Sequence, residues 1–119
     1  AVARIGDVPV LVYATAAPAE VAAAQAALGA ARAATVIEDA FREIASALAA
    51  AGVGAFVVAG GETSGAVVEA LGVRALAIGP EIAPGVPWTC ALGERPLWLA
   101  LKSGNFGGDD FFARASATL

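Results

Sequence analysis

The sequence predicts an α/β fold with a mostly parallel sheet flanked by helices, arranged as a three-layer sandwich. Two patterns carry this prediction. Short runs of β-branched and apolar residues, such as Ala55–Ala59, have the composition of strands buried on both faces, as in a parallel sheet. These runs alternate with helical patterns, and the order strand, loop, helix, strand is that of a right-handed βαβ unit.

The N-terminal part is expected to begin with a strand and a helix. The run Val8–Ala14 is apolar almost throughout, which predicts a buried strand. Pro18 suits the first position of a helix, because an N–H at that position would have no acceptor within the helix. The helix is expected to continue over Ala19–Leu28 and to stop at Gly29.

The clearest helix is predicted over Ala33–Ala51 and should end at Gly52. Thr35 and Glu38, three residues apart, have the spacing of a capping box at its start. Apolar residues recur at intervals of three and four and define one stripe, which faces a core. The stripe consists of Val36, Ala40, Ile44, Ala47, Leu48 and Ala51.

The C-terminal half is expected to alternate strands, glycine loops and short helices. Strands are predicted over Ala55–Ala59, Ala75–Ile78 and Pro96–Leu101, with Thr89–Leu92 as a short strand or extended edge, and helices over Ala66–Leu71 and from Asp109 to about Ala117. Between them, Gly79–Trp88 contains three prolines and is predicted to be irregular. Cys90 lies in an apolar run and is interpreted as a core residue.

Composition limits the classes of function. The 119 residues fit one domain, 1–119, and 59% of them are hydrophobic while 15% are charged. So little charge indicates either surface that a partner, second domain or missing segment covers, or simply the Ala-rich composition of a high-GC genome. The net charge of −4, with Lys102 as the only lysine, argues against nucleic-acid binding.

Residue counts exclude several other sites. There is no His and one Cys, so zinc sites of the usual kind and a disulfide framework are excluded, and the lone thiol fits a cytoplasmic protein. No apolar stretch is long enough to span a bilayer, so no membrane partner is expected. The chain contains no Met and opens on Ala1, which predicts a fragment or a processed chain.

The first candidate site is the loop Gly60–Gly65, which follows a predicted strand and precedes a helix. Glycines allow a ligand to approach the backbone, and Thr63 and Ser64 bring hydroxyls to a helix start that attracts phosphate. Glu62 would repel phosphate unless it holds Mg²⁺ or a ligand hydroxyl. No lysine follows Gly65, so this is not a Walker A loop, and a simple helix-capping turn stays an equal alternative.

The second candidate site is the loop Lys102–Gly108. Lys102 could pair with phosphate as a point charge, and its glycines open the backbone to a ligand. Asp109 and Asp110 are interpreted as helix caps. If the two strands before the loops are neighbours, the loops enclose one cleft. Gly79–Trp88 would then form a third wall, or act only as a connector.

Taken together, several blocks of the sequence resemble the C-terminal end of the four-carbon acid sugar kinase family. The resemblance is close from Val53 to Phe112 and looser back to Val8. The blocks are Gly60-Gly61-Glu62-Thr63-Ser64-Gly65-Ala66-Val67, Leu71-Gly72-Val73, Ile78-Gly79-Pro80-Glu81-Ile82, Pro84-Gly85-Val86-Pro87-Trp88, Leu99-Ala100-Leu101-Lys102-Ser103-Gly104-Asn105-Phe106-Gly107 and Asp110-Phe111-Phe112.

The resemblance implies a two-domain kinase that uses ATP and Mg²⁺ to phosphorylate small sugar acids such as threonate or erythronate. The N-terminal domain supplies most of the acid site, and the C-terminal domain binds the nucleotide. The implied ATP contacts are Gly61, Glu62, Thr63, Ser64 and Gly104, with Gly60, Lys102, Ser103 and Asn105 as further candidates. No protein metal ligand is assigned, and the catalytic residues stay unknown because the base is expected in the missing domain.

The chain also departs from the family pattern. The large substrate domain and an earlier strand with a Ser-containing loop are not visible in it. It is therefore expected to be part of the C-terminal domain of a cytoplasmic kinase and to be inactive alone. The alternative is a non-catalytic structural or oligomerising module, and a homo-oligomer is retained as a candidate assembly.

Overall fold

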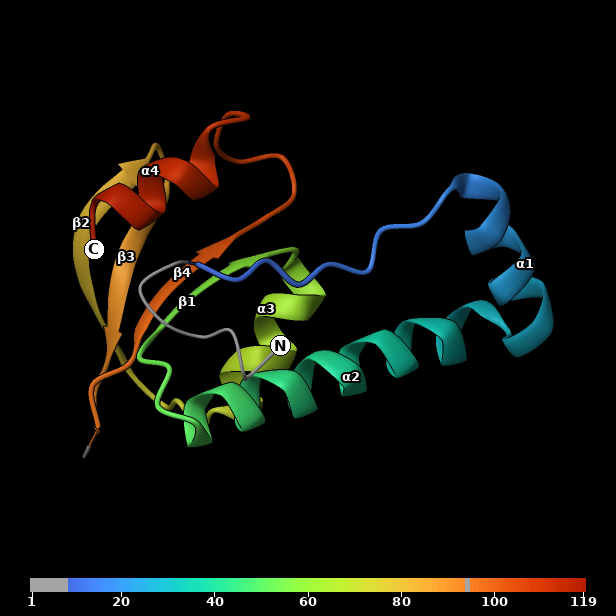
Figure 1. The fold of residues 1–119 in the computed structure, drawn as a ribbon, viewed down its shortest axis with the longest axis horizontal. Coiled ribbons are helices and arrows are strands. Elements are labelled where there is room, and N and C mark those ends of the chain that lie inside the picture. The colour runs from blue at the N-terminus through green and yellow to red at the C-terminus, as the bar shows by residue number, and fades with distance from the viewer. Residues whose placement is uncertain (1–8, 94) are drawn as a thin grey trace.

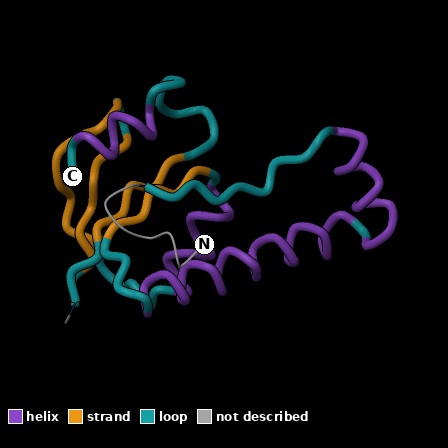
Figure 2. The backbone as a smooth tube through the Cα atoms, in the orientation of Figure 1, coloured by secondary structure: helices purple, strands orange, loops and turns teal. Residues whose placement is uncertain are grey.

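The computed structural model describes residues 9–93 and 95–119. The elements follow one another along the chain as shown in Figures 1 and 2. They are α1 (Pro18–Leu28), α2 (Ala30–Ala50), β1 (Ala55–Ala59), α3 (Gly61–Ala70), β2 (Leu76–Ala83), β3 (Val86–Ala91), β4 (Trp98–Lys102) and α4 (Phe111–Ala117). In this part of the chain, no helix combines the length and the apolar character needed to cross a membrane.

The four strands form one mixed sheet in the order β1-β4-β3-β2. β1 pairs with β4 in parallel, whereas β4 with β3 and β3 with β2 are antiparallel. The predicted α/β class is confirmed, but the expectation of a mostly parallel sheet is wrong. β1 and β2 run in the same direction, as a βαβ unit requires, yet β4 and β3 lie between them.

A hairpin explains why the sheet is mixed. The segment Gly79–Trp88, predicted to be irregular, instead supplies the end of β2, a turn and the start of β3. Gly85 has a φ of +75° in the turn, and its N–H donates to Glu81 Oε1 at 2.7 Å. So short a connection can join only antiparallel strands.

The prolines of this hairpin lie where a sheet tolerates them. Pro80 is on β2, an edge strand that pairs with one neighbour only. A residue without an N–H costs less there than in a central strand, where both sides form hydrogen bonds. Pro87 is opposite Glu81, between two shifts of the β2–β3 register. Counting prolines therefore gave the wrong prediction, because edge position and register shifts remove much of the usual penalty.

The sheet buries apolar side chains on both faces. Phe56, Val58 and Leu99 belong to the cluster that packs against α2 and α3. Trp88 and Ala100 belong to a second cluster with residues of α4. Figure 1 shows α2 and α3 on one side of the sheet and α4 on the other. Cys90, expected in the core, is only half-buried.

Helix α2 contacts the sheet only with its C-terminal half. It begins at Ala30 rather than Ala33, so Thr35 is no N-cap, and its Oγ1 donates instead to Ala31 O at 3.0 Å. Its one buried residue is Ala45, flanked by partly buried residues that include Leu48. Val36 of the predicted stripe is 52% exposed. The stripe is thus only partly correct, because the first turns of α2 extend beyond the sheet.

Residues 9–28 form an arm that carries exposed apolar side chains. Residues 9–17 have no strand structure, so the predicted strand Val8–Ala14 is wrong over 9–14, and Val8 lies outside the described residues. Leu11 and Tyr13 are 67% and 70% exposed, and α1 buries no residue. Pro18 does open α1, as predicted. Among the described residues, the run 9–14 has no paired strand, so its apolar composition alone does not create one.

The packing of β4 leads to a stability prediction. Leu99 is fully buried at the centre of the sheet, so Leu99→Ala should lower the free energy of unfolding by about 2–5 kcal/mol through lost burial and a new cavity. Val36→Ala, on the exposed part of α2, should change it by less than about 0.5 kcal/mol. Chemical denaturation of both variants measures the difference, and equal losses would contradict this assignment of the core.

Candidate functional site

The two glycine loops lie side by side at the edge of the sheet formed by the carboxyl ends of β1 and β4. They follow β1 and β4, which are parallel neighbours with Ala59 paired to Lys102. The N–H of Gly60 donates to Lys102 O at 2.9 Å, which ties the start of one loop to the start of the other. The condition stated from the sequence, that the two strands be neighbours, is therefore met.

The first loop is tighter than predicted, because α3 begins at Gly61 and not at Ala66. Gly60 alone makes the turn, with φ +117° and ψ +132°. A Cβ at this position would lie 3.3 Å from Thr63 Oγ1. Glycine therefore suits both the positive φ angle and the close approach of the Thr63 side chain. The predicted loop residues Gly61 to Ser64 thus form the first turn of a helix.

This first turn offers unused hydrogen-bond donors. The first bond of the turn runs from Ser64 N–H to Gly60 O at 2.9 Å. The N–H groups of Gly61, Glu62 and Thr63 come before it, and within the described residues none of them has an acceptor. Such free N–H groups, together with the helix dipole, make a helix start attractive to an anion.

Ser64 adds a second unsatisfied group at the same place. Its Oγ is buried and has no hydrogen-bond partner among the described residues. A buried hydroxyl without a partner costs free energy, so such groups are rare in folded proteins. Glu62, two residues earlier, is exposed, and a Cβ at Gly61 would meet no atom within 4 Å. The turn therefore has room for a ligand above it.

The second loop is folded around the side chain of Lys102. The Nζ atom donates to Phe106 O at 2.6 Å, to Gly104 O at 3.3 Å and to Ser103 O at 3.4 Å. It also lies 5.5 Å from the ring centre of Phe111. A Cβ at Gly104 would meet no atom within 4 Å, so the outer side of this loop is also open.

Phe111 and Gly107 hold the other end of the second loop. Phe111 is 1% exposed and begins α4. Gly107 has a φ of +78°, and a Cβ there would lie 2.6 Å from Phe111 Cδ2. Asp110 occupies the N-cap of α4 but makes no side-chain cap bond, so the capping interpretation of Asp109 and Asp110 is not confirmed. Sequence reasoning missed these contacts, since the packing of one ring against one glycine leaves no sequence pattern.

The hairpin turn lies beside the second loop. A Cβ at Gly85 would be 3.2 Å from Phe106 Cε1. The carboxyl end of β2 also lies at the same edge as those of β1 and β4, because these three strands run in the same direction. The segment predicted as a third wall thus reaches the loops through its turn.

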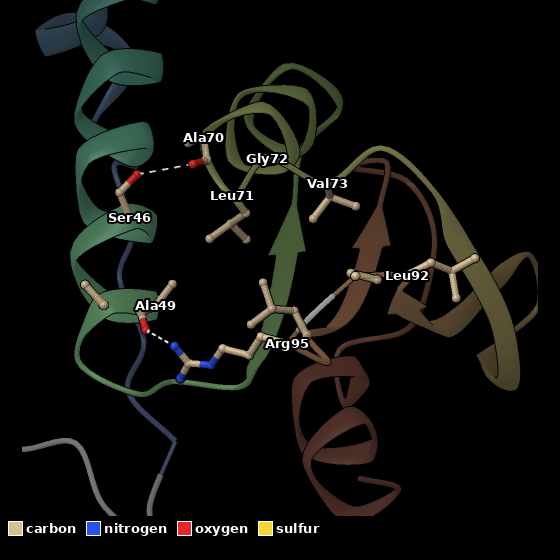
Figure 3. A pocket seen from close by; sticks show the side chains of 12 residues that line it. Ser46, Ala49, Ala70, Leu71, Gly72, Val73, Leu92 and Arg95 are labelled. Atoms are coloured by element: carbon tan, nitrogen blue, oxygen red, sulfur yellow. Dashed lines mark hydrogen bonds between the residues drawn. The ribbon is translucent and has the colours of Figure 1, made fainter.

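A separate pocket opens at the opposite edge of the sheet, where α2 and α3 end (Figure 3). It has a volume of about 500 Å³. Arg95 Nη1 donates there to Ala49 O at 3.0 Å, and Ser46 Oγ donates to Ala70 O at 3.5 Å. No residue predicted for the site lines this pocket.

Comparison with known proteins identifies a family that matches most of this chain. Residues 1–112 match the family model described as "Nucleotide-binding C-terminal domain". A 3-oxo-tetronate kinase of Cupriavidus necator is 63% identical over 90% of this chain and 25% of its own length. One from Pseudomonas fluorescens is 59% identical over the whole chain and 28% of its own length. The chain thus spans about a quarter of these relatives.

A solved structure is similar over most of the fold. The crystal structure described as a putative tRNA synthase from Salmonella typhimurium LT2 is 51% identical, with a TM-score of 0.79 over 86% of this chain and 24% of that protein. The family match covers nearly every described element, including both glycine loops. The chain therefore belongs to the family of nucleotide-binding C-terminal domains, as its resemblance to the four-carbon acid sugar kinases predicts.

Proposed function

We propose that this chain is the ATP-binding part of a kinase that phosphorylates a four-carbon sugar acid of the threonate, erythronate or 3-oxo-tetronate type. The observation that carries the proposal is the parallel pairing of β1 with β4, which places two open glycine loops at one edge of the sheet. The family match supports the nucleotide, and the names of the relatives support the class of acid. The whole of 1–119 is assigned to this one domain.

In this proposal, the start of α3 binds the phosphates of ATP. The free N–H groups of Gly61, Glu62 and Thr63 donate to phosphate oxygens, with Gly60 making the turn that exposes them. The unpartnered hydroxyl of Ser64, in the same first turn, is a further donor assigned to the same anion. Phosphate is therefore the ligand that would satisfy the unused groups of this turn.

The second loop would close over the nucleotide from the β4 side. Gly104 lets a ligand approach the backbone, and Ser103 and Asn105 flank it with polar side chains. Mg²⁺ would be bound mainly by phosphate oxygens and water, which is how it is usually held in kinase sites. It would neutralise charge that develops on the transferred phosphoryl group.

The sugar acid and the catalytic base are assigned to the remainder of a longer kinase. The relatives are about four times as long as this chain, since it covers 25% and 28% of them. The exposed apolar residues of the arm are a surface that such a remainder, or a second copy in a homo-oligomer, could cover. Because the reaction uses ATP, we place the protein in the cytoplasm.

Nucleotide binding can be tested on the chain as it stands. Mg·ATP should raise its stability, by about 2.7 kcal/mol when free ATP exceeds its Kd a hundredfold, because ATP binds only the folded state. Thermal unfolding and calorimetric titration measure the effect, with Mg²⁺ alone as the control. Absence of any shift at millimolar Mg·ATP would refute the binding proposal.

The hydroxyl of Ser64 separates a binding role from a folding role. Ser64→Ala removes a group that has no partner in the described structure, so the unfolding free energy should stay the same or rise by less than about 1 kcal/mol. ATP affinity should fall several-fold. The matched control is Ser46→Ala at the opposite edge, where the hydroxyl donates to Ala70 O. A Ser64→Ala chain with unchanged ATP affinity would remove the hydroxyl from the site.

Catalysis should require more than this chain. ATP consumption with threonate, erythronate and 3-oxo-tetronate should be absent for residues 1–119 alone. It should appear in a full-length kinase that carries this chain as its C-terminal part. A coupled assay of ADP release measures both. Turnover by the isolated chain would contradict the assignment of the base to the remainder of the protein.

A further inference from the structure

The ammonium group of Lys102 already donates hydrogen bonds to the backbone of its own loop. A lysine ammonium carries three N–H donors. Its Nζ contacts three carbonyl oxygens, those of Ser103, Gly104 and Phe106, at 3.4, 3.3 and 2.6 Å. The contact with Phe106 O is the shortest of the three. In this arrangement Lys102 has no donor left for a phosphate, although a phosphate contact is what the residue type suggests.

These bonds determine which way the loop presents its N–H groups. In a planar trans peptide, the C=O of one residue and the N–H of the next point in opposite directions. Carbonyls of Ser103, Gly104 and Phe106 that turn toward Nζ therefore turn the N–H groups of Gly104, Asn105 and Gly107 away from it. Among the described residues, none of these three N–H groups has an acceptor.

The position of the ammonium is itself fixed from two sides. Lys102 is the last residue of β4, and its carbonyl accepts the N–H of Gly60. On the other side Nζ lies over the ring of Phe111, which is buried and packs against Gly107. A cation over an aromatic face is attracted to the ring. The side chain thus connects the end of a strand to the start of α4 through the loop between them.

We propose that Lys102 is a positioning residue: it gathers the carbonyl groups of Ser103, Gly104 and Phe106 so that the N–H groups of Gly104 and Asn105 face the nucleotide phosphates. It does not itself contact phosphate. This inference rests on the proposed ATP site and specifies how one half of that site is built. The role resembles that of a bound cation at the centre of the loop, supplied here by the chain.

The test compares Lys102→Met with wild type in two measurements. In the ATP-free chain, amide hydrogen exchange of Phe106, whose N–H donates to Ser103 O at 3.2 Å, should become faster in the variant, because the carbonyls of Ser103 and Phe106 lose the ammonium donor that holds them in place. In calorimetric titration, the affinities for Mg·ATP and Mg·ADP should fall by the same factor, roughly tenfold, which is the scale of one lost hydrogen bond from a loop N–H to a phosphate that both nucleotides carry. A merely structural role would not lower both affinities while the melting temperature stays within a few degrees.

The control is Arg95→Met, which removes a cation that also donates to a backbone carbonyl, Ala49 O, at the opposite edge of the sheet. It should leave the amide exchange of Phe106 and both affinities unchanged. If Lys102→Met does not fold, Lys102→Gln keeps two N–H donors and should show smaller changes of the same kind.

Two results would overturn the inference. Unchanged amide exchange of Phe106 in the variant would show that Lys102 does not organise the loop, whether or not ATP binds. A loss for ATP much greater than for ADP, with unchanged exchange, would show a direct contact with the terminal phosphate. Failure of the wild-type chain to bind either nucleotide refutes the ATP site instead, and the exchange measurement still decides whether Lys102 organises the loop.

Discussion

The parallel pairing of β1 with β4 is the constraint on which the rest of the structure depends. These strands are distant in the sequence, and the chain between them must leave and return to the same sheet. It does so through α3 and through a hairpin that occupies the other side of β4. The pairing aligns Ala59 with Lys102, so the residues that follow each strand emerge together. A different partner for β1 would separate the two glycine loops.

The same pairing divides the core between the two faces of the sheet. Leu99 faces the cluster with α2 and α3, and the next residue, Ala100, faces the cluster with α4. Both are fully buried, as a central strand requires. Because successive side chains of β4 point to opposite faces, helices pack on both faces of the sheet. Helix α4 in turn carries Phe111 to the second loop. Packing and site geometry have a common origin.

At the edge where the loops meet, the fold leaves polar groups unsatisfied. The start of α3 has free N–H groups and a buried Ser64 hydroxyl without a partner in the described structure. Such groups lower stability unless a ligand completes them, and departures of this kind are expected at functional sites. The second loop differs, because Lys102 satisfies its carbonyls internally. One half of the proposed ATP site is thus left open, and the other is held in shape.

The sequence alone determined the local elements: strand composition in Ala55–Ala59, the proline start of α1, and the glycine loops with the family they resemble. These features are encoded by residues close together in the chain. Only the tertiary structure decided strand direction, the hairpin within Gly79–Trp88 and the inward turn of Lys102. The run 9–14 looks like a strand but has no paired strand among the described residues. A strand needs a partner and an ammonium turned into a loop needs acceptors, and neither can be read from a local composition pattern.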